Sequence, residues 1–218
     1  MLQAYYENNH KFFIAVNCII FGFHKNELNI LISKDSLPGT FMGENQSLTE
    51  AAGKVISKYT QQKDIYPEQV GAYDDINRDS GGRVVSVAFY ALIQAGKLNK
   101  SLAKQTDTKW INVKQIPELV LNHNKMVNNA IELLRYKVAT QPVAFQLFDD
   151  KFTLPALQNL YEEIYQTPLD KRNFRKKLAS MEITDRLEEK DKTCSKRGAF
   201  YYKFNPEKYD QFIKEGKR

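Results

Sequence analysis

The sequence predicts an α+β protein of two domains, and three observations lead to this prediction. The 218 residues exceed what one small domain usually needs, so an average domain and a smaller one are expected. Strand and helix patterns alternate up to about residue 140. Beyond it the order becomes helix, helix, strand, charged loop and strand. We therefore expect domains of residues 1–140 and 141–218.

The first domain contains several strand patterns. Residues 11–23 and 28–33 are rich in β-branched and aromatic side chains, and the turn-like HKNE at 24–27 separates them. This arrangement predicts a hairpin. Residues 69–76 form a further strand candidate, and RVVSVAFYALI at 83–93 forms a strong one. At least four strands are therefore expected.

Two helices are expected in the same domain. Residues 47–60 begin with Ser47, and Glu50 stands three positions later, which is the capping-box pattern. Residues 121–138 repeat apolar side chains at helical spacing. The sequence Thr-Gln-Pro at 140–142 interrupts this second helix, which supports a domain boundary there.

The second domain has the element order of a winged helix-turn-helix. Residues 152–165 predict a helix with Thr153 as its N-cap, and residues 169–181 predict a second helix with Asp170 as its N-cap. The other expected elements are short strands at 182–188 and 199–204 and a final helix at 205–216. The charged sequence between the two strands would form the wing.

Basic residues are concentrated on the second of these helices. The net charge is +6, and KRNFRKK at 171–177 holds five of the cations. In a helix-turn-helix the second helix enters the major groove, where Asn and Arg suit base edges and Lys suits phosphates. A solvated helix face is the alternative, but the preceding helix and the basic wing favour DNA. The expected DNA contacts are Lys171, Arg172, Asn173, Arg175, Lys176, Lys192, Lys196 and Arg197.

Composition argues against several classes of protein. Hydrophobic residues make up 42% and charged residues 27%, as in ordinary globular proteins, and no apolar run approaches the ~20 residues of a membrane span. The N-terminus lacks the pattern of a secretory signal. Cys18, Cys194 and the three histidines show no disulfide or metal-ligand pattern. We expect a cytoplasmic protein with no membrane, metal or cofactor.

The sequence LPGTFMGENQSLTEAAGKVISKYTQQ from Leu37 resembles the Nudix box, G-x5-E-x7-R-E-U-x-E-E-x-G-U. The box positions fall in order on Thr40, Gln46, Lys54, Val55, Ile56, Lys58, Tyr59 and Gln61. Nudix hydrolases hold Mg²⁺ with carboxylates on this helix, since this hard cation prefers oxygen ligands. None of those carboxylates is present here, so the sequence predicts no catalytic residue and no enzyme.

RDSGGRVVSVAFYALI at 78–93 resembles the Nudix-related transcriptional regulators of the NrtR type. The later sequences FTLPALQNLYEEI and KRGAFYYKF also resemble their DNA-binding domains. The resemblance implies an N-terminal Nudix-like α/β/α sandwich that senses an effector, followed by a C-terminal winged helix-turn-helix. It also implies a homodimer that binds double-stranded operator DNA.

The resemblance implies two possible effectors. The best-known members of the family sense ADP-ribose, whereas a Bacteroidetes branch with a similarly degenerate box responds to L-arabinose. A neutral sugar needs only convergent hydrogen-bonding groups, so the lost box favours L-arabinose. Lys54, Lys58 and Arg83 could still pair with phosphates, which keeps ADP-ribose as the alternative.

The expected ligand-binding residues are Lys34, Thr40, Asp74, Arg83, Ser86 and His123. Each also has a structural alternative. Asp74 and Arg83 could pair across strands, Ser86 could be a satisfied core hydroxyl, and His123 could cap a helix.

Three functions remain open from the sequence. The favoured one is a repressor that its ligand releases from operator DNA. An active Nudix hydrolase with an appended domain is the second, and the missing carboxylates argue against it. A module that binds RNA or another protein is the third.

Overall fold

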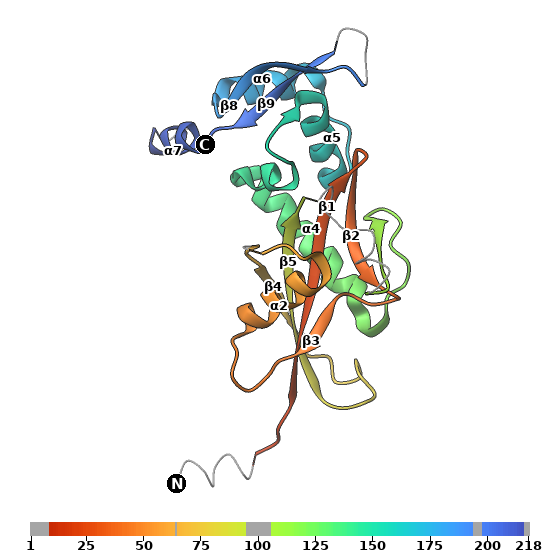
Figure 1. The fold of residues 1–218 in the computed structure, drawn as a ribbon. Coiled ribbons are helices and arrows are strands. Elements are labelled where there is room, and N and C mark those ends of the chain that lie inside the picture. Colours follow the sequence, from red (N-terminus) through yellow and green to blue (C-terminus); the bar gives the residue numbers. More distant parts are fainter. Residues whose placement is uncertain (1–8, 64, 95–105, 194–197, 216–218) are drawn as a thin grey trace.

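The computed structural model describes residues 9–63, 65–94, 106–193 and 198–215 (Figure 1). It contains a mixed six-stranded sheet with helices on both faces, and a smaller three-stranded sheet with its own helices. The molecule is elongated, and the smaller sheet lies beyond one end of the large sheet (Figure 1). None of the helices formed by these residues is long and apolar enough to cross a lipid bilayer.

The large sheet has the strand order β4-β5-β1-β2-β6, and β3 also pairs with β1. Its strands are β1 (Phe13–His24), β2 (Glu27–Ser33), β3 (Gly39–Phe41), β4 (Glu68–Tyr73), β5 (Val84–Ile93) and β6 (Thr108–Asn112). The two longest strands, β1 and β5, are parallel and central, with Phe13 opposite Val84 and Gly22 opposite Ile93. The predicted strands of the first domain are therefore confirmed.

The predicted hairpin is formed by β1 and β2. Its turn consists of Lys25 and Asn26, whose φ angles are 52° and 62°. Two consecutive positive φ angles match the twist of the flanking strands, and Asn tolerates this conformation well. The register His24 opposite Glu27 closes the hairpin with two loop residues.

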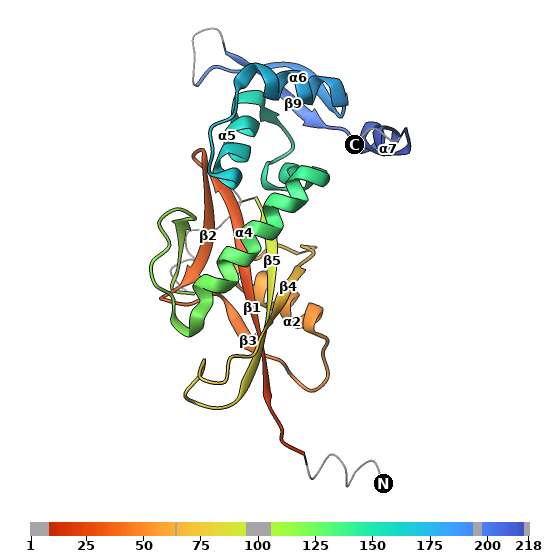
Figure 2. The same cartoon turned by 180° about the vertical axis from the view of Figure 1, so that it is seen from behind.

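Helices α2 (Leu48–Thr60) and α4 (His123–Thr140) cover opposite faces of the large sheet. Because side chains alternate along a strand, Cys18 and Ile20 of β1 pack in the α2 layer, whereas Ile19 and Phe21 pack in the α4 layer. The result is the predicted α/β/α sandwich. Figure 2 shows α4 crossing the sheet toward the smaller sheet.

The predicted capping box of α2 is present. The Ser47 hydroxyl accepts the Glu50 backbone N–H at 3.2 Å, and the Glu50 carboxylate accepts the Ser47 backbone N–H at 2.7 Å. These reciprocal bonds satisfy donors that a helix N-terminus leaves without partners. The Ser47 backbone N–H and, at 3.0 Å, the Ser47 hydroxyl both donate to the Glu50 carboxylate, and these two bonds lower the pKa of Glu50.

The C-terminal elements form a winged helix. They are η3 (Pro142–Leu147), β7 (Phe152–Thr153), α5 (Leu154–Tyr165), α6 (Lys171–Met181), β8 (Thr184–Asp191), β9 (Ala199–Phe204) and α7 (Pro206–Lys214). Strands β8 and β9 form the wing hairpin, and β7 pairs with β9. Thr153 and Asp170 cap α5 and α6 as predicted.

Three short strands were not predicted from the sequence, and the junction that follows residue 140 was not expected to contain a helix. Strands β3, β6 and β7 have only 3, 5 and 2 residues, too few for a clear period-2 pattern. The junction instead contains η3, whose Val143 and Leu147 are buried in the core of the large sheet. Leu160 and Ile164 of α5 join the same core, so the winged helix packs directly on the first domain.

Candidate nucleic-acid interface and effector site

Helix α6 is held on α5 by a short apolar contact. Phe174 packs edge-on against Tyr161, with ring centroids 5.5 Å apart. Leu178 and Met181 follow Phe174 at helical spacing and are partly buried. This face fixes the helix, so its opposite face is free for a partner.

The turn between α5 and α6 is fixed by Glu162. Its carboxylate accepts the Leu169 backbone N–H at 3.0 Å and the Gln158 side-chain N–H at 2.9 Å. The Leu169 bond is the main cause that holds the pKa of Glu162 below its ordinary value, and the charge of Lys171 adds to it. The start of α6 is therefore placed by polar bonds as well as by packing.

The outward face of α6 carries the predicted DNA-binding side chains. Lys171, Arg172, Asn173, Arg175 and Lys176 are all exposed. At 100° per residue, Arg172 and Lys176 lie opposite Phe174, and Asn173 and Arg175 flank them. None of the four cations forms an ion pair with any residue in the described part of the chain. The helix thus presents an uncompensated positive surface.

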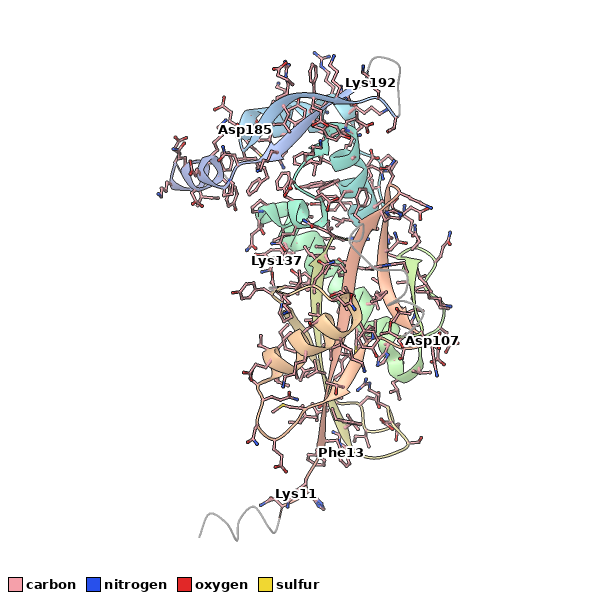
Figure 3. The ribbon with its side chains drawn as sticks, viewed as in Figure 1. Lys11, Phe13, Asp107, Lys137, Asp185 and Lys192 are labelled. Carbon is pink, nitrogen blue, oxygen red and sulfur yellow. The ribbon has the colours of Figure 1, made fainter. Side chains whose placement is uncertain are left out.

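The wing adds further cations. Arg186 and Lys190 of β8 both lie over the Phe200 ring of β9, at 4.2 Å from its centroid. Lys192 is exposed just beyond the end of β8 (Figure 3). The predicted contacts Lys196 and Arg197 lie outside the described residues. The structure therefore places five predicted residues on one helix and Lys192 in the wing.

The α2 helix does not fit a magnesium site. Val55, at the position of a Nudix glutamate, is buried against the sheet. Lys58, at another such position, lies over the Tyr59 ring at 5.1 Å from its centroid. Lys54 donates to the Gln46 side chain at 3.1 Å. Apolar and cationic groups occupy the places where Mg²⁺ needs oxygen donors.

A buried polar pair lies in the α4 face of the large sheet. The Ser86 hydroxyl of β5 donates to the Asn17 side chain of β1, and both residues are buried. Gly39 of β3 lies against this pair, since a Cβ there would be 2.6 Å from Asn17 Nδ2. Ser86 was predicted from the sequence, whereas Asn17 was missed because it stands inside an apolar strand.

His123 is buried beside the loop that leads into β3. It is 2% exposed, and its Nδ1 accepts the Leu37 backbone N–H at 3.1 Å. Burial lowers the pKa of His123 to about 4, and the charge of Arg78 acts in the same direction. His123 therefore stays neutral near pH 7.

The other predicted ligand residues lie at the surface. Arg83 donates to the backbone oxygen of Asp74 at 2.5 Å, so the pair forms through the main chain and not between the two charges. Arg83 also lies over the Phe12 ring at 5.6 Å from its centroid. Thr40 and Lys34 are exposed, and Lys34 lies in the turn after β2. These residues are separate from the buried pair of Asn17 and Ser86.

The structure adds candidates that sequence reasoning did not select. Arg78 donates through Nε to the Leu121 backbone oxygen at 2.8 Å, just before α4 begins. Tyr73 of β4 accepts the Asn129 side-chain N–H of α4 at 2.9 Å through its hydroxyl. Arg78 belongs to the RDSGGRVVSV segment already singled out, so that motif could have identified it.

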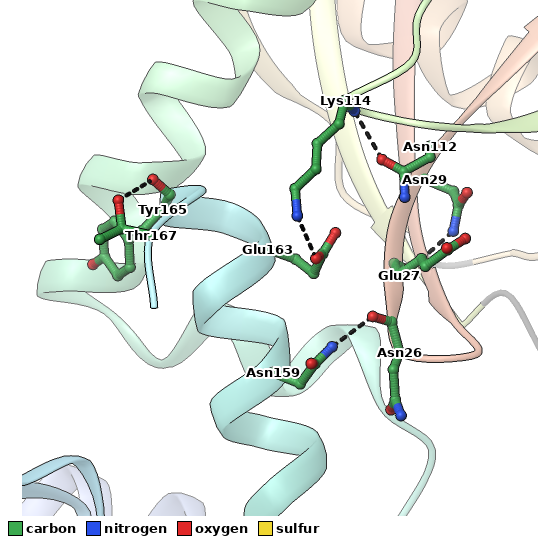
Figure 4. Close-up of polar contacts among 9 residues, drawn as sticks. All are labelled: Asn26, Glu27, Asn29, Asn112, Lys114, Asn159, Glu163, Tyr165 and Thr167. Atoms are coloured by element: carbon green, nitrogen blue, oxygen red, sulfur yellow. Dashed lines mark hydrogen bonds and ion pairs between the residues drawn. The ribbon is translucent and has the colours of Figure 1, made fainter. Parts of the chain in front are cut away.

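Polar bonds also join the winged helix to the first domain (Figure 4). Asn159 of α5 donates to the Asn26 backbone oxygen at 2.5 Å, and Lys114 Nζ lies 2.6 Å from Glu163 Oε1. Arg135 of α4 donates to the Ile164 backbone oxygen at 2.8 Å. Helix α5 is therefore attached to the hairpin turn, to the segment after β6 and to α4.

Comparisons with known proteins agree with this architecture. Residues 144–204 match the family described as the NrtR DNA-binding winged helix domain. The ADPR responsive transcriptional repressor NtrR of Acinetobacter baylyi is 27% identical over 210 residues, which cover 90% of this chain and 84% of the relative.

Two solved structures share the fold along nearly the whole chain. NrtR of Shewanella oneidensis, complexed with a 27mer DNA, has a TM-score of 0.75 and 24% identity and covers 90% of this chain and 95% of its own. A MutT/nudix family protein from Enterococcus faecalis has a TM-score of 0.73 and 18% identity, covering 94% and 92%. The fold is thus a Nudix domain followed by a winged helix. The chain is thus similar to the NrtR-type, Nudix-related winged-helix regulators in the sequence of its winged helix and in its fold.

Proposed function

We propose that this protein is a ligand-responsive repressor that binds double-stranded operator DNA through α6. The observation that carries the proposal is the outward face of α6, with exposed Arg172, Asn173, Arg175 and Lys176 and no ion pair among the described residues. Such a face suits the major groove, where Arg and Asn contact base edges and Lys contacts phosphates. The NtrR relative, a transcriptional repressor, supports the same function.

The repressor would act as a homodimer. Two copies related by a two-fold axis would present their α6 helices to half-sites about 34 Å apart, one turn of DNA. A ligand that binds better to a dimer with another spacing of the α6 helices would release the DNA. The ligand can weaken DNA binding only by the ratio of its affinities for the two dimer states. The joint between α5 and the first domain would carry such a change to α6.

The two candidate effectors share one chemical group, a pentose ring with several hydroxyl groups. L-arabinose is our first candidate, because the α2 helix lacks the carboxylates that would hold a metal-bound diphosphate. ADP-ribose is the second, and the ADPR-responsive relative favours it. Both would bind in the first domain. Ser86 and His123 are the buried members of the predicted set, Arg83 is partly buried, and Lys34, Thr40 and Asp74 are exposed.

Duplex binding to promoter fragments of the protein's own genome tests this proposal. The assay compares DNA alone, DNA with L-arabinose and DNA with ADP-ribose. Release by only one compound identifies the effector. An absence of duplex binding in every condition would contradict the repressor and favour a module for RNA or protein binding.

We also propose that the protein is not a Nudix hydrolase. Val55 and Lys58 occupy glutamate positions of the box, so the helix offers neither metal ligands nor a carboxylate base there. Incubation with ADP-ribose and Mg²⁺, followed by analysis of the products, tests this point. Turnover that depends on Mg²⁺ would contradict it.

A further inference from the structure

His123 holds a buried hydrogen-bond donor that the described residues do not satisfy. A neutral imidazole carries one ring proton, and Nδ1 already accepts the Leu37 N–H, so the proton is on Nε2. His123 is 2% exposed, and no acceptor for Nε2 occurs among the residues that the structure describes. A buried donor that stays unpaired is energetically unfavourable. An acceptor from outside the chain would remove this cost.

The segment just before His123 is strained. Leu121 and Asn122 have φ angles of 55° and 57°, a left-handed conformation that Asn tolerates but that costs energy at Leu121. Arg78 holds this segment through its bond to the Leu121 backbone oxygen. Val120 and Leu121 are 42% and 38% exposed although both are apolar. Strain of this kind gathers at ligand sites, where surrounding contacts maintain it.

The charges around His123 indicate which acceptor fits. Arg78 is the cation that acts on His123, and Asp35 acts on it with the opposite sign. Asp75 and Asp79 in turn act on Arg78. Charged groups of both signs therefore act on His123 and on Arg78. A neutral hydroxyl suits both signs, because its oxygen accepts from Nε2–H and its hydrogen can be donated to a carboxylate.

We propose that His123, at the first turn of α4, is the anchor of a sugar-hydroxyl subsite in the first domain. The Nε2–H of His123 donates to a hydroxyl oxygen of a neutral pentose ring. This inference rests on the ligand-responsive function proposed above and names a residue that would bind the effector. The bound ring can be free L-arabinose or the terminal ribose of ADP-ribose.

A matched pair of variants separates this role from a structural one. His123→Asn keeps an acceptor near the position of Nδ1 for the Leu37 N–H but removes the Nε2 donor. His123→Gln keeps a donor near the position of Nε2 but loses the Nδ1 acceptor. Calorimetric titration of the full chain with L-arabinose and with ADP-ribose, beside thermal unfolding, gives affinity and stability separately.

We expect His123→Asn to bind the effective compound about tenfold more weakly, the change for one lost hydrogen bond to a buried donor, and His123→Gln to stay within about threefold. Equal affinities, equal losses or the reverse order would overturn the subsite. If the wild-type chain binds duplex DNA but neither compound, the effector proposal itself fails, and the subsite fails with it.

Discussion

Lys114 Nζ lies 2.6 Å from Oε1 of Glu163 and thereby ties the segment after β6 to α5 of the winged helix. The Glu163 side chain is only 13% exposed, and its Oε2 has no hydrogen-bond partner within the described ranges. A carboxylate in this position depends on its cation, because removing the partner leaves a poorly solvated charge. The pair is therefore a specific part of the joint between the two domains.

Lys114→Met should lower the free energy of unfolding by about 1–2 kcal/mol, a value discounted because Lys114 itself is half exposed. The double variant Lys114→Met/Glu163→Gln should recover part of this loss, because it no longer leaves a charge without a partner. Chemical denaturation of the wild type, of Lys114→Met, of Glu163→Gln and of the double variant measures both effects. Strictly additive losses in the double variant would show that the two side chains are not coupled.

Arg172→Ala and Asn173→Ala should weaken binding to the operator by about 1–3 kcal/mol while changing binding to unrelated duplex much less, because these side chains would contact bases. Lys176→Ala should weaken binding to both duplexes and reduce the salt slope by about one, as expected for one phosphate contact. Fluorescence anisotropy on both duplexes measures these effects. Lys109→Ala, on β6, is the control and should change neither affinity.

Gly39→Ala should destabilise the protein by about 1–3 kcal/mol, since overpacking forces neighbouring groups to move. The added Cβ would be 2.6 Å from Asn17 Nδ2 and 2.8 Å from the Val16 backbone oxygen. Gly53→Ala is a matched control, because no atom lies within 4 Å of a Cβ at this helical position. It should leave stability unchanged or raise it by up to about 1 kcal/mol. Thermal unfolding of both variants measures the change in stability. Equal changes for the two variants would contradict the close approach of neighbouring atoms at Gly39.

Stability should fall on acidification because of His123. Burial lowers the pKa of His123 from 6.5 to about 4, so the unfolded chain takes up a proton that the folded chain does not. This contribution of His123 to the free energy of unfolding is present above about pH 6.5 and is lost as the pH falls toward 4. Between pH 7 and pH 5 the loss is about 2 kcal/mol, from 1.36 kcal/mol per unit. His123→Asn should show a flatter profile over this range, and an unchanged profile would assign the effect to other groups.

The strong patterns of the sequence predicted most of this structure. The β-branched and aromatic side chains of β1 and β5 identified the main strands, and the caps at Ser47, Thr153 and Asp170 identified three helices. The packing of α5 on the first domain was not predictable, because Leu160 and Ile164 also fit the core of an independent winged helix. Local patterns do not say which neighbour an apolar face meets.

The candidate sites were predictable to different degrees. The basic face of α6 depends on one helix and its spacing, so the sequence alone locates it. The proposed effector site depends on contacts between distant segments, such as Asn17 with Ser86 and Leu37 with His123. Those contacts arise from sheet order and loop placement, which residue types do not reveal. Arg83 and Asp74 show the same limit, since their contact runs through a backbone oxygen.

Duplex binding by the wild-type chain and by the triple variant Arg172→Ala/Arg175→Ala/Lys176→Ala, over a range of salt concentrations, tests the central claim most directly. The account predicts tight, salt-sensitive operator binding by the wild type. The variant should show a much weaker affinity, a salt slope lower by at least about one and an unchanged unfolding midpoint. Equal affinity and equal salt slope for the two proteins would show that α6 is not the surface that meets DNA.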